Sequence, residues 1–180
     1  MLLLYADDMA LLAETPSDLH DSLDRLKQYC DQWGMEVNCA KTKVMIFKKR
    51  GSVRRSEHWT YANTDLEIVS DFNYLGTVFN SHGFFSSNQN TLASKGLKVS
   101  TFHCNKLKGF SFTPKVCCEL FDAFVSSILN YACEVWGTVE SKEIERIQLR
   151  YCKQILGVKL SLSNAAVYGE LNRYPLYVNR

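Results

Sequence analysis

The amino-acid sequence predicts an α+β protein in which short strands come first and helices follow. Three observations support this class. Two apolar runs flank a tight acidic turn near the N-terminus, aromatic and β-branched runs follow up to residue 80, and helical periodicity begins after that. Strands followed by helices, without regular alternation, are typical of an α+β fold. We expect a boundary near residues 81–87, which gives two domains, residues 1–80 and 81–180.

The first two expected strands flank a pair of adjacent acids, Asp7 and Asp8. Residues 1–5 and 9–13 are mostly apolar, and each run is long enough for a buried strand. The few residues between the runs predict a tight hairpin with both carboxylates at its tip. Neighbouring carboxylates repel each other unless a cation lies beside them, and Mg²⁺ prefers such oxygen ligands. The alternative is an ordinary polar turn, in which Asp is common.

The next segment predicts one amphipathic helix. Thr15 and Pro16 suit an N-cap and a first helical position, and Gly34 suits a terminator. Apolar residues between them recur at spacings of three and four, which predicts one stripe packed on the back of the sheet. The stripe consists of Leu19, Leu23, Leu26, Cys30 and Trp33.

The remaining elements are short strands and then helices. We expect strands at 44–47, 58–61 and 66–69, with a turn at 63–65, and a pair of strands within 72–79. We expect helices at 88–108, 114–136, 141–156 and 164–171. In the first of these helices, Leu92, Val99, Phe102 and Leu107 are expected to point inward, and Lys95, Lys98, Lys106 and Lys108 outward. The second is largely apolar, which predicts burial on most sides.

Charge is distributed unevenly along the 180 residues, although the formal net charge is only +2. Residues 1–36 carry a net charge of −6, residues 37–118 carry +8, and residues 119–180 are balanced. The densest basic run lies between residues 48 and 55, around a glycine, and predicts an exposed loop. A basic middle beside an acidic, metal-binding start suits an enzyme that holds a polyanion next to cations. The alternative for the basic run is a solvated loop that serves solubility.

Composition favours a soluble intracellular protein. The apolar fraction of 46% is enough for a core, and no apolar run approaches the roughly 18–20 residues of a membrane span. Seven cysteines without a Cys-x-x-Cys pair predict reduced thiols packed as small hydrophobes. We therefore expect an intracellular protein that does not enter a membrane, and leave nuclear or cytoplasmic location open.

Four motifs occur in a characteristic order along the chain. They are Tyr5-Ala6-Asp7-Asp8, the segment 33–38 (WGMEVN), the segment 41–47 (KTKVMIF) and the segment 72–76 (FNYLG). Their order and spacing resemble the late palm of reverse transcriptases, and of the non-LTR retrotransposon branch in particular. The segments 130–137 and 168–171 resemble the helical region that follows that palm. The resemblance covers nearly the whole chain.

The resemblance implies a fold and a reaction. The fold would be a partial antiparallel polymerase palm sheet with a packed helix, followed by an all-α, thumb-like region. The reaction of the intact parent would be RNA-templated addition of deoxynucleotides to a primer 3′-OH, with two Mg²⁺ ions. Asp7 and Asp8 would bind metal, with Asp7 the more important. Lys41 would neutralise the incoming triphosphate or protonate the leaving pyrophosphate, unless it is a solvated surface lysine. No further cofactor is implied.

The partners implied are an RNA template, a DNA primer and, in the parent, deoxynucleoside triphosphates. Segment 72–79 would be the primer grip, although an ordinary strand pair remains the alternative. The residues expected to contact nucleic acid are Tyr5, Lys48, Lys49, Arg50, Arg54, Arg55, Tyr74, Leu75, Gly76, Lys95 and Lys98. The oligomeric state is left open.

Only four residues precede Tyr5, whereas in the family the fingers and the first half of the palm come before this motif. The chain is therefore expected to be a C-terminal palm and thumb fragment that is inactive alone. Two alternatives remain open. One is a non-catalytic nucleic-acid-binding remnant, and the other is a relic whose helices form a protein-interaction domain.

Overall fold

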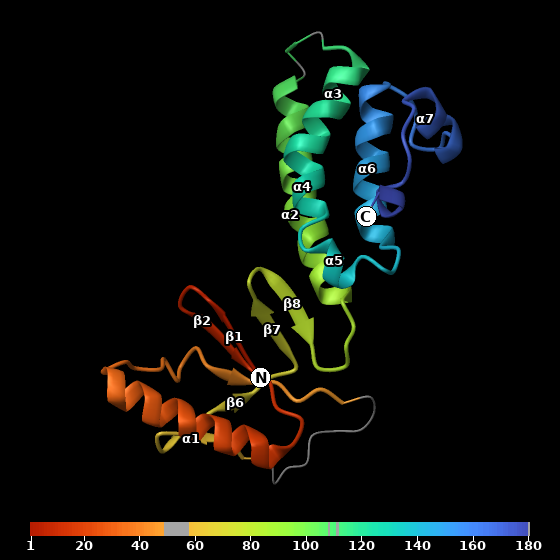
Figure 1. Ribbon diagram of the computed structural model, residues 1–180. Coiled ribbons are helices and arrows are strands. Elements are labelled where there is room, and N and C mark those ends of the chain that lie inside the picture. Colours follow the sequence, from red (N-terminus) through yellow and green to blue (C-terminus); the bar gives the residue numbers. More distant parts are fainter. Residues whose placement is uncertain (49–57, 108, 111, 180) are drawn as a thin grey trace. The chain divides into compact units, whose positions relative to one another are not determined.

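The computed structural model describes residues 1–48, 58–107, 109–110 and 112–179. Short strands and helices are both present, and helices dominate the second half, which confirms the α+β class (Figure 1). The chain divides into two compact units. The N-terminal unit comprises residues 1–72 and 80–83, and the helical unit comprises residues 73–79 and 84–180.

Strands of the described chain pair in twos. β1 (Leu2–Tyr5) pairs with β2 (Asp8–Leu11), and β4 (Thr60–Tyr61) pairs with β5 (Thr64–Asp65), both antiparallel. β3 (Lys43–Val44) pairs in parallel with β6 (Glu67–Ile68), and β7 (Asp71–Tyr74) pairs with β8 (Thr77–Asn80). These separate ladders differ from the antiparallel sheet that we expected, and the expected strand 44–47 is reduced to β3. The expected turn at 63–65 lies instead at Ala62–Asn63, where both residues have positive φ.

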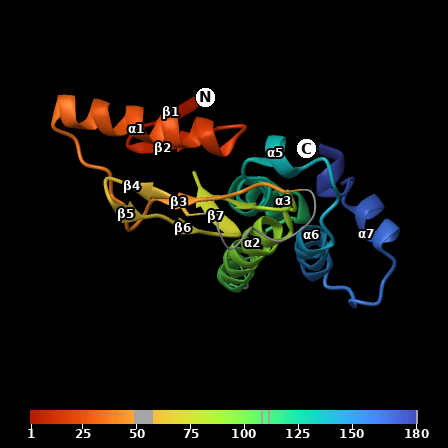
Figure 2. The same cartoon turned by 90° about the horizontal axis from the view of Figure 1, so that it is seen from below.

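Helix α1 (Pro16–Trp33) begins and ends as predicted. The Thr15 side chain accepts a hydrogen bond from the Asp18 amide, and Gly34 adopts the left-handed conformation with a φ of 63°. Figure 2 shows α1 on one side of the strands β3, β4, β5 and β6. Leu23 joins a buried cluster with Val44, Trp59, Tyr61 and Leu66.

The prediction that Trp33 belongs to the buried stripe of α1 is wrong. Trp33 is 64% exposed, whereas Cys30, one turn earlier, is 4% exposed. The Trp33 side chain contacts the exposed ring of Tyr29, at 6.3 Å between ring centroids. The stripe therefore ends one turn before the helix does.

The helical unit is built on three helices that run side by side (Figure 1). They are α2 (Ser86–Leu107), the segment that starts with α3 (Pro114–Phe121), and α6 (Lys142–Ile155). α7 (Asn164–Glu170) and the 3₁₀ turn η2 (Leu176–Asn179) pack on α6. Their core consists of Leu92, Ala93, Cys104, Phe121, Val125, Leu129, Trp136, Ile144, Ile147, Tyr151 and Leu176.

The expected single helix over 114–136 is wrong, because the chain changes conformation twice within it. A π-helical turn, η1 (Asp122–Ser126), follows α3 and leads into α4 (Ser127–Leu129). The chain then breaks before α5 (Cys133–Trp136), where Ala132 has a φ of 53°. This break releases the Tyr131 carbonyl from helical pairing, and that carbonyl accepts a hydrogen bond from the Trp136 indole at 2.8 Å. Trp136 is thus buried because the chain breaks before α5, and a continuous helix is not needed.

Two phenylalanines predicted to be buried are not. Phe102 of α2 is 64% exposed and Phe124 of η1 is 57% exposed. Phe102 lies on the outer face of α2, away from Leu92 and Cys104. The π-helical turn rotates Phe124 outward, while its neighbour Val125 is fully buried.

All seven cysteines carry free thiols. Five of them are buried, namely Cys30, Cys104, Cys117, Cys118 and Cys152. Burial raises the pKa of the Cys152 thiol to about 12, which keeps it protonated and suits packing as a small hydrophobe. In the described part of the chain, every helix is too short or too polar to cross a lipid bilayer.

Candidate metal site and nucleic-acid interface

The two adjacent aspartates lie at the end of the β1–β2 hairpin. Ala6 and Asp7 form its two-residue turn, with Ala6 at a φ of 51°. Asp8 is the first residue of β2 and pairs with Tyr5. Side chains alternate between faces along a strand, so the pairing places Asp8 on the same face as Tyr5 and leaves Asp7 at the tip. The structure therefore confirms the hairpin and separates the positions of its two acids.

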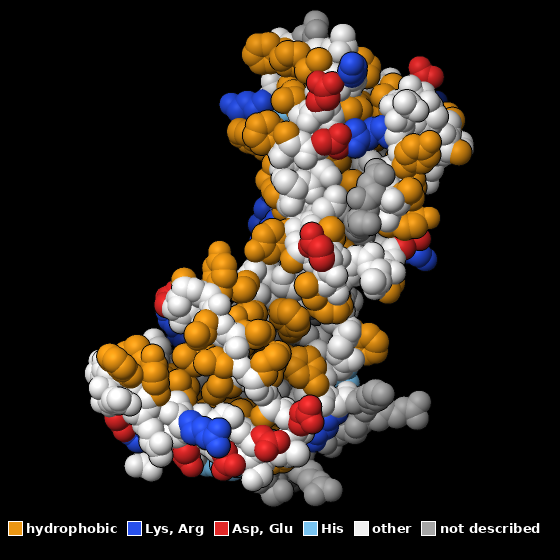
Figure 3. Space-filling model, in the orientation of Figure 1, with side chains coloured by type: hydrophobic (Ala, Val, Ile, Leu, Met, Phe, Trp, Pro, Cys, Tyr) orange, Lys and Arg blue, Asp and Glu red, His pale blue; other side chains and the backbone are white. Residues whose placement is uncertain are grey.

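The strands of this hairpin are not buried, contrary to the sequence prediction. Leu2, Leu3 and Leu4 are 48%, 43% and 63% exposed, and only Leu11 packs against the buried cluster of the N-terminal unit. Figure 3 shows this apolar surface on the N-terminal unit. The exposure arises because β1 and β2 pair only with each other within the described chain. An isolated two-stranded hairpin has only marginal stability in water.

The donor atoms of this tip suit Mg²⁺. Asp7 and Asp8 are both exposed, so their carboxylate oxygens are open to a hydrated ion. Mg²⁺ is usually held by one or two carboxylates, with water and phosphate oxygens completing its octahedron. Among the described residues, no group of three or more His, Cys, Asp or Glu side chains comes together. The tip of this hairpin therefore provides two carboxylates as possible metal ligands.

Lys41 and Lys43 differ in their surroundings. The Lys43 ammonium pairs with the Glu67 carboxylate at 2.7 Å, across the parallel β3–β6 ladder. Lys41 is exposed, and its backbone amide donates to the Asn38 side chain at 3.2 Å. Asn38 thereby holds the turn that carries Lys41, while the Lys41 side chain extends into solvent. Of the two lysines, Lys41 is therefore the one able to meet a phosphate without breaking an ion pair.

The β7–β8 hairpin is closed by Leu75 and Gly76. Both residues have positive φ, 48° and 79°, which a type I′ hairpin turn requires and which Gly tolerates without strain. The Tyr131 hydroxyl donates to the Leu75 carbonyl at 2.9 Å. A Cβ built on Gly76 would lie 3.1 Å from the Tyr131 ring. In this chain the open side of Gly76 therefore receives a tyrosine ring, and a contact with nucleic acid stays a prediction.

Further contacts fix the β7–β8 hairpin. The side-chain oxygen of Asn88, 1% exposed, accepts a hydrogen bond from the Val78 amide at 3.0 Å. The rings of Phe79 and Phe85 meet edge to face at 6.0 Å. The sequence pattern did not predict the roles of Asn88 and Tyr131. Tyr131 is 56 residues from Leu75, so no local pattern could reveal it.

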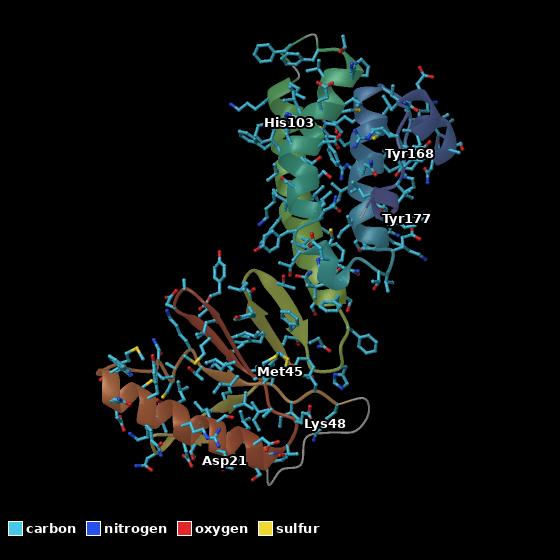
Figure 4. The ribbon with its side chains drawn as sticks, in the orientation of Figure 1. Asp21, Met45, Lys48, His103, Tyr168 and Tyr177 are labelled. Atoms are coloured by element: carbon cyan, nitrogen blue, oxygen red, sulfur yellow. The ribbon has the colours of Figure 1, made fainter. Side chains whose placement is uncertain are left out.

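The expected basic contacts are only partly within the described chain. Lys49, Arg50, Arg54 and Arg55 lie outside the described residues. Lys48 is the last residue described before them (Figure 4), and its amide donates to the Ser81 carbonyl at 3.1 Å. Lys95 and Lys98 are exposed on α2, as predicted.

The N-terminal part of the chain is similar to a known protein family. Residues 1–79 match the family described as reverse transcriptase (RNA-dependent DNA polymerase). This segment contains α1, both aspartates and most of the β7–β8 hairpin. The similarity to the reverse transcriptase family therefore covers residues 1–79.

Two relatives extend the similarity to transposable elements. The chain is 27% identical over 161 residues to an uncharacterized transposon-derived protein of Caenorhabditis elegans. The aligned region covers 87% of this chain and 57% of that protein. It is 33% identical over 89 residues to the retrovirus-related Pol polyprotein from type-1 retrotransposable element R2 of Nasonia vitripennis, covering 45% and 9% respectively. No solved structure matches the chain. The predicted resemblance to a non-LTR retrotransposon reverse transcriptase is confirmed by these matches.

Proposed function

We propose that this chain is the late-palm and thumb part of an RNA-directed DNA polymerase of a non-LTR retrotransposon. Residues 1–80 correspond in this proposal to the palm from the catalytic hairpin to the primer grip, and residues 81–180 to the thumb. The observation that carries it is the match of residues 1–79 to reverse transcriptases, with Asp7 at the turn of an exposed hairpin. The chain spans 57% of one relative and 9% of the other, so the activity of a whole polymerase is part of the proposal.

The chemistry assigned to the hairpin is metal-assisted nucleotidyl transfer. Two Mg²⁺ ions, when bound, lower the pKa of the primer hydroxyl and neutralise charge on the leaving pyrophosphate. Asp7 supplies the principal carboxylate and Asp8 an auxiliary one. Lys41 faces solvent and places its ammonium near the triphosphate. The β7–β8 hairpin positions the primer end, supported by Tyr131 and Asn88.

A metal-binding experiment tests the assignment of Asp7. Paramagnetic Mn²⁺ broadens NMR signals of nuclei close to its site, so titration should broaden the amides of residues 6–9 before others. Asp7→Asn should abolish this broadening, because it removes a charged oxygen ligand. Asp21→Asn is the matched control, since Asp21 is an exposed acid on α1 (Figure 4). Equal loss in both variants, or unchanged broadening in Asp7→Asn, contradicts the assignment.

The 180-residue chain is expected not to extend a primer. Phosphoryl transfer depends on positioned charges, and the carboxylates here lie on a two-stranded hairpin whose apolar side chains are exposed. Primer extension on an RNA template, with Mg²⁺ or Mn²⁺, should therefore give no product above background. Extension by the purified chain that disappears in Asp7→Asn contradicts this expectation.

One second function is favoured by a specific observation. From Phe72 to Cys118 the sequence has five lysines and no acidic residue, which suits nucleic-acid binding without catalysis. Salt-dependent binding of a hybrid by the wild type and by Asp7→Asn alike, with no metal binding at residues 6–9, would select this alternative.

A further inference from the structure

Helix α2 carries a stripe of long side chains on its outer face. Lys95, Lys98, Phe102 and Lys106 follow one another at spacings of three, four and four residues, which places them on one side of a helix. All four are exposed. The opposite side of α2 is buried in the core of the helical unit through Leu92, Ala93, Gly96, Ser100 and Cys104. We call the four exposed residues, Lys95, Lys98, Phe102 and Lys106, the α2 stripe.

Phe102 is the unusual member of this stripe. Its side chain is 64% exposed, although burying a phenylalanine would be favourable. The Lys106 ammonium lies 5.5 Å from the centre of its ring. This cation–π contact holds the ring in place without covering it. Phe102 therefore presents an exposed aromatic ring, fixed by Lys106, with lysines before and after it on the helix.

The surroundings of the stripe are uniformly non-acidic in sequence. No acidic residue occurs between Asp71 and Glu119, so the lysines of α2 have no neighbouring acid along the chain. Two further exposed aromatic residues lie in the same stretch, Phe110 and Phe112, with their rings 5.6 Å apart. Figure 3 shows Lys and Arg side chains beside hydrophobic ones along the edge of the helical unit. Positive charge and open aromatic rings together match the chemistry of a polyanion with flat bases.

We propose that the α2 stripe binds single-stranded nucleic acid, with an unpaired base stacked on Phe102 and phosphates at Lys95, Lys98 and Lys106. A duplex would satisfy the lysines but leaves Phe102 unused, because paired bases already stack on each other. An unpaired base offers a free face, and a single strand brings a phosphate on each side of it. The inference rests on the proposed function, in which residues 81–180 form the thumb, and adds an unpaired strand to what that region binds.

A binding experiment separates the two strand types. Fluorescence anisotropy of the full chain is measured with a labelled single-stranded RNA of about 12 nucleotides, within the usual site size, and with an RNA–DNA hybrid of the same length. Phe102→Leu keeps an apolar side chain but removes the ring. It should weaken single-strand binding by roughly five-fold or more and leave hybrid binding unchanged. Phe84→Leu is the matched control, because Phe84 is 68% exposed and precedes α2. It should bind both probes as the wild type does.

The outcomes distinguish this inference from the proposed function. Hybrid binding without single-strand binding, or equal single-strand affinities of Phe102→Leu and the wild type, overturns the inference and leaves the proposed function standing. Phe102-dependent single-strand binding without hybrid binding supports the inference and counts against the thumb assignment. Absence of binding to both probes overturns both.

Photo-crosslinking gives an independent readout. Trypsin cleaves after Lys98 and Lys106, so Phe102 falls in the peptide of residues 99–106. A single-stranded RNA containing 4-thiouridine should crosslink to this peptide, and Phe102→Leu should reduce the crosslink while Phe84→Leu does not. Crosslinks confined to other peptides overturn the proposal.

Discussion

Gly96 shows how closely α2 is packed in the helical unit. A Cβ at this position would lie 2.3 Å from the end of the Leu129 side chain, and Leu129 has no exposed surface. Gly is usually unfavourable inside a helix, by roughly 0.5–1 kcal/mol relative to Ala. At Gly96 this intrinsic cost is offset by the close approach of α2 and α4.

Gly96→Ala is expected to destabilise the chain by about 1–3 kcal/mol, because the added methyl must displace Leu129 from a filled core. Gly169→Ala is the control, since Gly169 is also helical but no atom lies within 4 Å of its added Cβ. That variant should be neutral or slightly stabilising. Urea denaturation of both variants gives the comparison. Equal free energies of unfolding for the two would show that the α2–α4 contact is misassigned.

His103 is expected to make the stability of the helical unit depend on pH. Burial lowers the pKa of its imidazole, and its Nδ1 lies 3.3 Å from the Tyr151 hydroxyl (Figure 4). A lowered pKa in the folded state means that stability is present above the ordinary pKa of about 6.5 and is lost as pH falls below it. The wild type should therefore melt at a lower temperature at pH 5.5 than at pH 7.5, with a smaller difference in His103→Gln. Thermal denaturation at the two pH values checks this, and an unchanged difference in the variant refutes the role of His103.

At the scale of elements, α1 is the part that local sequence specifies best. Its cap, its proline and its terminating glycine act within one or two turns, so they work whatever lies around the helix. Its buried face depends on the strands beneath it, and that dependence is why Trp33 was misjudged. The 114–136 segment also departs from its local pattern, because the π-helical turn η1 and the break at Ala132 interrupt a run that the sequence predicts as one helix.

Leu23→Ala is expected to reduce the stability of the N-terminal unit by about 2–5 kcal/mol, because Leu23 is 7% exposed and lies in its core. Lys27→Ala, one turn later, should change stability by no more than about 0.5 kcal/mol. Its ion pair with Asp31 is exposed and therefore screened. Loss of α1 helicity on heating, followed by circular dichroism, compares the two. Similar effects of both substitutions would mean that the buried face of α1 is wrongly assigned.

At the scale of the whole molecule, the sequence predicted the fold class and the hairpins but not the contacts between residues far apart in the chain. Hairpin turns and caps are local, so the turn between β1 and β2 and the ends of α1, α6 and α7 could be anticipated within one or two residues. The exposure of Leu2–Leu4 could not, because an apolar run reads as buried whether or not a partner covers it. The candidate metal ligands were predictable from two adjacent acids. The support of Leu75 by Tyr131 was not.

The charge distribution makes the central claim testable at this scale. Residues 37–118 carry a net charge of +8, and phosphate binding by such a segment releases counterions. Binding should thus be weak, indifferent to base sequence and steeply dependent on salt. Replacing Lys49, Arg50, Arg54 and Arg55 with Ala removes four positive charges from this segment. Replacing Lys142, Arg146, Arg150 and Lys159, all exposed, removes four from the C-terminal part and is the matched control.

The measurement that tests the account most directly is the salt dependence of binding to an RNA–DNA hybrid. The affinity of the wild type should fall steeply as the salt concentration rises, with a logarithmic slope of about one per phosphate contact. The variant of the basic run should show a clearly shallower slope, and the control variant should keep that of the wild type. Hybrid binding that does not respond to salt, or equal slopes for the two variants, would contradict phosphate binding by the basic run of residues 48–55.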